Sequence, residues 1–215
     1  MSTEEWFKTH YIPWRESRIN KIVSIFGKEF FNNKTMLELA AGHGDTGHYF
    51  YNLGSIVTFA DGNEGHLVKI KKTNPDSTVL HIDQDKEWNL NKQFDIVVHW
   101  GVLYHLDNWQ KDLKTAIEHG KIIFLETEVC DSNDPTFEIK TSESGYDQAV
   151  NGIGSRPSAA MVEGCINETG ANYVRYDDAD INAEFHKYDW KVNDTKEWTD
   201  GQRRFWIIRN EVYST

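Results

Sequence analysis

Residues 36–47, MLELAAGHGDTG, constrain the fold of this chain more than any other segment. The apolar pair Met36-Leu37 is typical of a buried strand. Small residues then follow at Ala40, Ala41, Gly42, Gly44 and Gly47. Because glycine lacks Cβ, such a turn can adopt positive φ, and a ligand can lie directly on its backbone. The segment therefore predicts a strand, a tight turn and the start of a helix, as in the first βα unit of a nucleotide-binding α/β fold.

The charges at this turn bear on which ligand it binds. Gly42-x-Gly44-x-x-Gly47 matches the dinucleotide fingerprint, in which a pyrophosphate binds amides at the helix start. Glu38 and Asp45, however, put two carboxylates here, and like charges ~4 Å apart repel by ~4 kcal/mol at an effective dielectric of ~20. A cationic ligand without phosphate, such as S-adenosylmethionine, suits the turn better. An NAD-dependent dehydrogenase and a turn without any ligand are the alternatives.

Composition limits the class of protein. The 215 residues are enough for a single α/β domain with a sizeable core. The formal net charge of -11 opposes non-specific binding to nucleic acid or to an anionic membrane. Cys130 and Cys165 are too few for a disulfide framework and lack metal-ligand partners at useful spacing, so we expect reduced thiols, no metal and a cytoplasmic protein. We expect neither a signal peptide nor a membrane helix, which needs ~20 apolar residues.

Acidic residues follow the next two predicted strands. Residues 55–60 form the second strand and lead into Asp61-Gly62-Asn63. An acid at this place, about 20 residues after a glycine turn, can accept hydrogen bonds from both ribose hydroxyls. Such charge-assisted bonds contribute roughly 1.5–3 kcal/mol. The alternative role for Asp61 is a helix N-cap. The third predicted strand, STVLHID, ends in Asp83-Gln84.

The fourth predicted strand adds a more specific signal. Residues 94–99, FDIVVH, are almost continuously apolar, which is typical of a strand buried on both faces, and WGVLYHL follows. Together, residues 94–106 resemble the fourth-strand region of class I S-adenosylmethionine-dependent methyltransferases. Glu38-x-Ala40-x-Gly42-x-Gly44 resembles the first motif of that family, with Ala40 in place of a usual glycine. The resemblance is nearest to the group that includes the tRNA wobble-uridine carboxymethyltransferase.

Further segments match that group in chain order, so that the resemblance covers about residues 35–208. They are LETEVCD (125–131), RPSAAMVEGCINETGA (156–171) and TDGQRRFW (199–206). The resemblance implies a doubly wound, mostly parallel seven-stranded sheet of Rossmann type and S-adenosylmethionine as the cofactor. Leu106 stands where the group has an arginine, the long N-terminal region of the tRNA enzyme is missing, and no basic stripe is evident. We therefore expect plain S-adenosylmethionine rather than its carboxylated form.

The resemblance also implies roles for individual residues. Glu38, Ala40, Gly42 and Gly44 would hold the amino-acid end of the cofactor, and Asp61, Gly62 and Asn63 its ribose. Asp83 would accept from the adenine amine beside Gln84, and Trp88 would flank the ring. Finally, the residues implied to line the pocket or lie near the reactive end of the cofactor are Trp100, Tyr104 and Arg203.

Three other segments complete the expected domain. Residues 1–31 form a helical cap in which Pro13 separates two helices, and Trp6, Tyr11, Trp14, Arg15 and Arg18 either cover the ligand or pack the cap on the core. Residues 130–157 lack periodicity and form a substrate lid or, alternatively, are disordered. Residues 177–201 form a long hairpin between strands at 173–176 and 204–209.

Methyl transfer from a sulfonium is an in-line displacement, in which alignment contributes roughly 7–11 kcal/mol. A base is needed only if the acceptor must lose a proton, and His105 is the candidate, unless it merely caps or packs the following helix. The sequence predicts a methyltransferase that acts on a small molecule. The alternatives are a tRNA wobble-uridine methyl or carboxymethyl transferase and a non-catalytic S-adenosylmethionine-binding subunit. We do not expect DNA as the substrate, because the motifs of amino-methylating and cytosine-C5 enzymes are missing.

Overall fold

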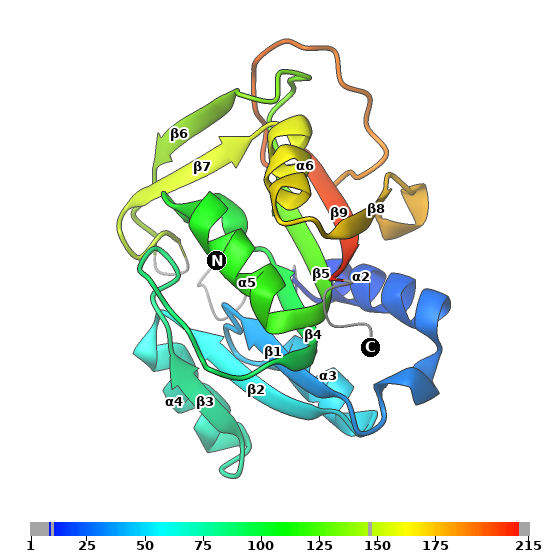
Figure 1. Ribbon diagram of the computed structural model, residues 1–215, viewed down its shortest axis with the longest axis vertical. Helices are drawn as coiled ribbons and strands as arrows, with labels where there is room; N and C mark the ends of the chain where they lie inside the picture. Colours follow the sequence, from blue (N-terminus) through cyan, green and yellow to red (C-terminus); the bar gives the residue numbers. More distant parts are fainter. Residues whose placement is uncertain (1–8, 10, 146–147, 211–215) are drawn as a thin grey trace.

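The chain folds around a seven-stranded sheet with helices on both faces (Figure 1). This computed structural model describes residues 9, 11–145 and 148–210. The strand order is β3-β2-β1-β4-β5-β9-β8. The strands are β1 (Thr35–Leu39), β2 (Ile56–Asp61), β3 (Thr78–His81), β4 (Phe94–Trp100), β5 (Gly120–Glu128), β8 (Asn172–Tyr176) and β9 (Arg203–Arg209). β1 to β5 are parallel and β9 is antiparallel to both neighbours, which confirms the expected doubly wound sheet.

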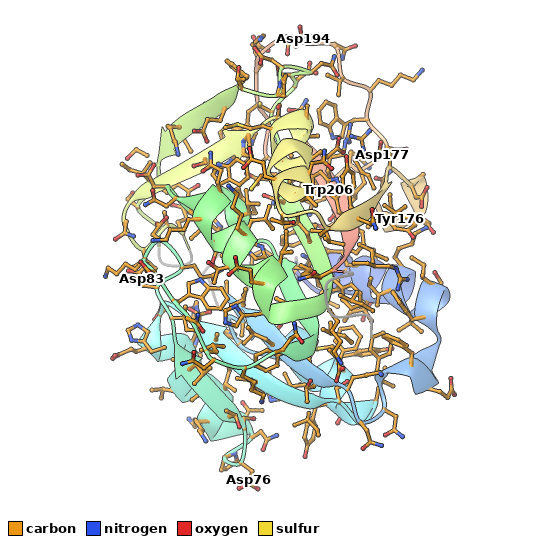
Figure 2. The ribbon with its side chains drawn as sticks, viewed as in Figure 1. Asp76, Asp83, Tyr176, Asp177, Asp194 and Trp206 are labelled. Atoms are coloured by element: carbon orange, nitrogen blue, oxygen red, sulfur yellow. The ribbon has the colours of Figure 1, made fainter. Side chains whose placement is uncertain are left out.

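Two cores form because successive side chains of a strand point to opposite faces of the sheet. Val97 of β4 packs in the core under α5 and α6, whereas its neighbours Ile96 and Val98 pack in the core under α2, α3 and α4. Trp206 of β9 lies beneath α6 (Figure 2), where its Nε1 donates to Glu163 at 3.2 Å. The helices are α2 (Tyr11–Phe26), α3 (Asp45–Asn52), α4 (Glu64–Thr73), α5 (Trp109–His119) and α6 (Ala159–Glu168), with short 3-10 turns η1 (Lys28–Phe31), η2 (Leu103–His105) and η3 (Ala179–Ile181).

The strand order determines where a ligand can bind. From β1 the chain proceeds outward through β2 and β3, and then returns to the other side of β1 to form β4. At such a reversal the loops after neighbouring strands diverge, and they leave a crevice at the carboxyl ends of the strands. The residues after β1, β2, β3 and β4 are therefore brought to one edge of the sheet.

The N-terminal region differs from the expected pair of helices. α2 begins at Tyr11, and Pro13 lies within its first turn instead of separating two helices. Proline is tolerated there because the first N–H groups of a helix have no partner within it. Residues 1–8, which include Trp6, and residue 10 of the expected helix before Pro13 lie outside the described residues.

Residues 130–157 contain regular structure that the sequence pattern did not predict. β6 (Glu138–Ser142) and β7 (Ile153–Pro157) pair antiparallel as a separate two-stranded ribbon. Because β6 is polar and only partly buried, it lacks the apolar alternation that marks a strand. The expected long hairpin at 177–201 is also wrong, because this segment contains η3 and isolated bridges but no paired strands of its own.

None of the helices in the described part of the chain has the length and apolar character that crossing a bilayer requires.

Candidate functional site

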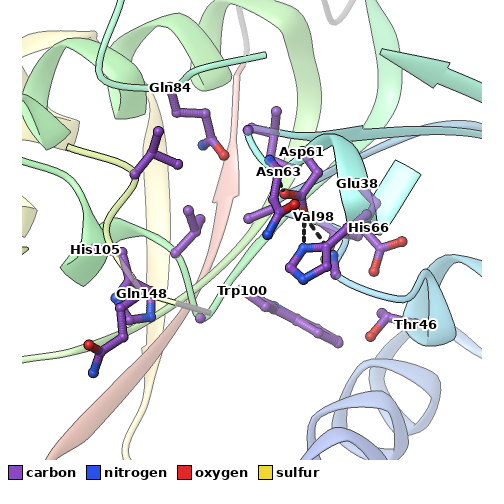
Figure 3. A pocket seen from close by; sticks show the side chains of 18 of the residues that line it. Glu38, Thr46, Asp61, Asn63, His66, Gln84, Val98, Trp100, His105 and Gln148 are labelled. Carbon is purple, nitrogen blue, oxygen red and sulfur yellow. Dashed lines mark hydrogen bonds and ion pairs between the residues drawn. The ribbon is translucent and has the colours of Figure 1, made fainter. Parts of the chain in front are cut away.

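A cavity of about 520 Å³ opens at the carboxyl edge of β1, β2, β3 and β4 (Figure 3). Within it, His105 and Gln148 lie at one end and Glu38 and Thr46 at the other, with Trp100 between them. Most of the residues predicted from the sequence line this cavity: Glu38, Ala40, Gly42, Asp61, Gly62, Asn63, Asp83, Gln84, Trp100, Tyr104 and His105. The described residues contain no group of three His, Cys, Asp or Glu side chains that could hold a metal ion.

Gly44 is the exception among the predicted glycine-turn residues, because it does not line the cavity. It caps α3 in the left-handed region with φ 78°. A Cβ there would lie 3.1 Å from Cγ1 of Ile70 and 3.2 Å from Cε1 of Phe59. Gly44 therefore shapes the turn and allows it to pack on the core. Ala40 has φ 49°, which explains why a glycine is usual at its position.

Glu38 is a buried carboxylate at the end of β1. Its Oε2 accepts a hydrogen bond of 3.0 Å from the Gly47 amide. Burial raises its pKa to about 8; the Gly47 hydrogen bond opposes this rise, and the nearby carboxylates of Asp45 and Asp61 add to it. Without a ligand, Glu38 therefore holds a proton at neutral pH, and a bound cation would favour its ionised form.

Asp61 joins the glycine turn to the turn after β2. Its Oδ2 accepts from the Gly42 amide at 2.8 Å, and its Oδ1 accepts from the Asn63 amide at 2.7 Å. Nδ1 of His66 lies 3.2 Å from Oδ2, as the dashed lines in Figure 3 mark. Asn63 in turn caps α4 by accepting from the amide of Gly65. Asn63, and not Asp61, is thus the N-cap of α4, and Asp61 lines the cavity.

The segment after β3 forms the next wall. Asp83 pairs with Lys86 at 2.8 Å, and Gln84 donates to Oδ2 of Asp112 at 3.0 Å. Trp88 is not in the cavity wall, which corrects the expectation that it flanks the ligand. Its Nε1 donates to Oδ1 of Asp112 at 2.8 Å, so this tryptophan fixes the loop on α5. The sequence could not indicate this partner because Asp112 is 24 residues away.

Helix α2 supplies the wall opposite these loops. Tyr11, Trp14, Arg15 and Arg18 all line the cavity, so the part of the cap that is described covers the site. The Arg18 guanidinium lies 3.9 Å from the ring centroid of Trp14 and 4.9 Å from that of Trp100. Arg15 pairs with Asp45 of the glycine turn at 3.0 Å.

A row of buried charges lies behind this wall. Glu126 of β5 accepts from Arg18 at 3.0 Å and from Arg203 at 3.1 Å. Arg203 also donates to Glu128 at 2.8 Å, and Glu128 pairs with Arg156. Arg203 was expected near the reactive end of the cofactor; it does not line the cavity itself, but its guanidinium lies 4.9 Å from the ring centroid of Tyr104, which does. Arg203 lies behind the pocket, held by the two glutamates, and this placement lends no support to a carboxylated cofactor.

His105 ends η2 and lies at the far end of the cavity from Glu38. Its Nδ1 is 2.5 Å from Oε2 of Glu143, which follows β6. Glu143 also accepts from Arg156 at 2.7 Å. Glu143 and Arg156 were not predicted as site residues, because they belong to the hairpin that the sequence pattern did not reveal. His105 pairs with a carboxylate from another element instead of capping the following helix.

The sequence and the fold were compared with known proteins. The model of a family described as "Methyltransferase domain" matches residues 11–195. No protein of curated function matches the chain. Among solved structures, the fold is similar to the N-terminal domain of EvdMO1, determined in the presence of SAH and D-fucose, with a TM-score of 0.65 and 14% identity over 92% of this chain and 82% of that chain.

Two further solved structures have a similar fold. One is an S-adenosylmethionine-dependent methyltransferase from Mesorhizobium loti, with a TM-score of 0.65 and 12% identity over 90% of this chain and 98% of that chain. The other is magnesium protoporphyrin IX methyltransferase from Synechocystis PCC 6803 with bound SAM, with a TM-score of 0.61 and 10% identity over 94% of this chain and 83% of that chain. The fold is thus the Rossmann-like fold of class I methyltransferases, and because the family match spans most of its length, the chain belongs to the methyltransferase-domain family.

Proposed function

We propose that the cavity binds S-adenosylmethionine and that the enzyme transfers its methyl group to a small-molecule acceptor. One observation carries this proposal: Glu38 and Asp61 lie at the carboxyl ends of β1 and β2, Asp83 follows the adjacent parallel strand β3, and all three line a single cavity. Three acids at one edge suit a ligand with an ammonium group, ribose hydroxyls and an adenine amine. They would repel a pyrophosphate.

Each part of the cofactor would contact its own set of cavity-lining residues. Glu38 would hold the ammonium group, and the backbone at Ala40 and Gly42 would lie along the amino-acid chain. Arg15, whose charge acts on Glu38, would pair with the cofactor carboxylate. Asp61 would bind the ribose, and Asp83 would accept from the adenine amine.

Further cavity-lining residues would contact the ribose and the adenine. Gly62 and Asn63 would complete the ribose wall, and Gln84 would lie beside the adenine ring. Trp100, which lies between Glu38 and His105, would flank the sulfonium together with Tyr104.

His105 is the group that would accept a proton from the acceptor. It lines the cavity at the end away from Glu38, beside Gln148 of the β6–β7 connection, and side chains from α2 line the same cavity. These walls, together with the formal net charge of -11, favour a small acceptor over RNA.

A screen for S-adenosylhomocysteine release tests the acceptor class. Purified protein is incubated with S-adenosylmethionine and with pools of phenols, alcohols, hydroxy acids and amines, and separately with total tRNA at physiological salt. We expect product only in small-molecule pools. Release with tRNA alone, together with salt-sensitive micromolar binding, would favour the tRNA alternative.

A further inference from the structure

We propose that the β6–β7 hairpin builds the general base of this enzyme: Glu143 positions His105, and the acceptor is a protic group that loses its proton during methyl transfer. This inference rests on the proposed function, and it narrows the substrate to hydroxyl-bearing or other X–H acceptors. Its evidence is the way in which the hairpin holds η2.

Side chains of the hairpin form hydrogen bonds with the backbone on both sides of His105. Three of the hairpin's side chains donate to three carbonyl groups of residues 104–107. These bonds run from Arg156 to Tyr104 at 2.7 Å, from Ser155 to Leu106 at 2.6 Å and from Lys140 to Asp107 at 2.7 Å. Ser155 is fully buried, and Arg156 is 4% exposed. The position of the His105 backbone is therefore set by the hairpin as well as by β4.

The close approach of hairpin and η2 depends on Gly154. A Cβ at this position would lie 2.5 Å from the carbonyl oxygen of Tyr104 and would overlap Oε1 of Glu143. No larger side chain fits without displacing one of these groups. The hairpin backbone at Gly154 therefore packs closely on Tyr104, the chain neighbour of His105, and on Glu143, its hydrogen-bond partner.

Glu143 is a buried anion whose two carboxylate oxygens are held by His105, Arg156 and the Ala149 amide. Its side chain is 3% exposed, its Oε2 lies 2.5 Å from Nδ1 of His105, and the Ala149 amide donates to the same oxygen at 3.0 Å. Burial opposes ionisation, but the hydrogen bonds and charges of His105 and Arg156 prevail and lower its pKa to about 2. Arg156 and Glu128 are the other charged groups near this pair.

This geometry assigns the tautomer of His105. A carboxylate can only accept, so Nδ1 carries the hydrogen and Nε2 is left as the basic nitrogen of the neutral ring. During transfer, the acceptor atom X attacks the methyl carbon, and the C–S electron pair passes to sulfur to give S-adenosylhomocysteine. The proton of X–H passes to Nε2, and Glu143 stabilises the resulting imidazolium until it returns the proton to solvent.

A second histidine–carboxylate pair in the protein shows what a purely structural pair looks like. His99 and Asp112 are both fully buried, with Nε2 of His99 2.7 Å from Oδ2 of Asp112, and neither residue lines the cavity. The side chain of His105, by contrast, is 20% exposed and lines the cavity. Of these two pairs, only His105–Glu143 can meet an acceptor bound in that cavity.

Nitrogen NMR of the histidine rings tests the assignment without any acceptor. Protein labelled with ¹⁵N-histidine is compared with the His105→Gln variant, which identifies the ring signals. At a pH where the ring is neutral, we expect protonated Nδ1 and unprotonated Nε2. Glu143→Gln should lose this preference, whereas Glu138→Gln, on the same hairpin but bonded to Trp109, should keep it. A proton on Nε2 in the wild type would overturn the proposal.

Kinetics supply the second arm, with acceptors found in the screen described above. We expect His105→Gln to lower kcat by roughly 10²–10⁴-fold and Glu143→Gln, which no longer fixes the tautomer, by up to roughly 10⁴-fold, with the KM for S-adenosylmethionine unchanged. Equal kcat in all variants, or a best acceptor that has no proton to lose, would contradict the proposal. Absence of S-adenosylmethionine binding in calorimetry would instead contradict the proposed function, and the NMR result would still decide the tautomer.

Discussion

Oε2 of Glu38 accepts a hydrogen bond of 3.0 Å from the amide of Gly47, and this pair joins the end of β1 to the first turn of α3. The contact leaves no room for a side chain at position 47. A Cβ there would lie 2.5 Å from Oε2 of Glu38 and would overlap Cε1 of Phe59. The third glycine of the turn thus serves the helix–strand contact and the candidate cofactor site at once.

We expect Gly47→Ala to lower the free energy of unfolding by roughly 1–3 kcal/mol, as overpacking does, and to weaken S-adenosylmethionine binding. Urea unfolding and calorimetry measure the two effects. Gly164→Ala in α6 is the matched control, because a Cβ there meets nothing within 4 Å. It should raise stability by about 0.5–1 kcal/mol. Equal stability of Gly47→Ala and wild type would show that the turn is looser than described.

Glu38 makes stability depend on pH. Its pKa in the folded chain is raised from 4.5 to about 8, chiefly by burial. The folded state therefore retains a proton that the unfolded chain has already released, and this group lowers stability progressively as pH rises from 4.5 to about 8. Glu38→Gln cannot ionise, so we expect it to be more stable than the wild type near pH 8. Urea unfolding of both proteins across this range should show the difference vanish at acidic pH.

The same carboxyl group should release a proton when the cofactor binds. An ammonium group beside Glu38 favours the carboxylate, so binding near pH 7 converts a protonated side chain into an ionised one. Calorimetry in two buffers of different ionisation enthalpy measures this release. Glu38→Gln should bind more weakly and release no proton from this position. A wild type that binds without proton release would place the ammonium group elsewhere.

Removing one of the buried charges behind the pocket should lower the free energy of unfolding. Glu126 is fully buried and accepts from both Arg18 and Arg203. We expect Glu126→Gln to lower the free energy of unfolding by about 3–5 kcal/mol, because it removes the carboxylate that compensates the buried Arg18 and one of the two that hold Arg203. Glu168→Gln is the control, since Glu168 pairs with Lys114 on the surface and such pairs contribute ~0.2–1 kcal/mol. If urea unfolding showed a similar loss of stability for both variants, the row of buried charges would contribute little to the free energy of unfolding.

Much of the fold was predictable because its signals are local. The apolar runs at β1, β2 and β4 and the glycine turn between β1 and α3 lie where the sequence pattern put them. Gly170, with φ 74°, follows α6 as a helix-ending glycine should. The β6–β7 hairpin could not be found in this way, because its strands are short and polar, and their partner is η2 rather than the main sheet.

The site residues that could be predicted are likewise those with local signals in the sequence. Asp61 and Asp83 follow strand ends at a spacing that can be read from the sequence, and both line the cavity. The partner of His105 could not be read, since Glu143 is 38 residues away along the chain. The partners of Arg203 could not be read either, because a resemblance gives the position of a residue in the chain, not the carboxylates that hold its side chain.

The most direct measurement is calorimetric titration of wild type and Asp61→Asn with S-adenosylhomocysteine and with NADH. The carboxylate of Asp61 should bind the ribose while it holds the Gly42 amide at 2.8 Å. We expect the wild type to bind S-adenosylhomocysteine and not NADH, and Asp61→Asn to lose roughly 1.5–3 kcal/mol of binding free energy. Unchanged affinity in Asp61→Asn, or NADH binding in place of S-adenosylhomocysteine, would contradict the account.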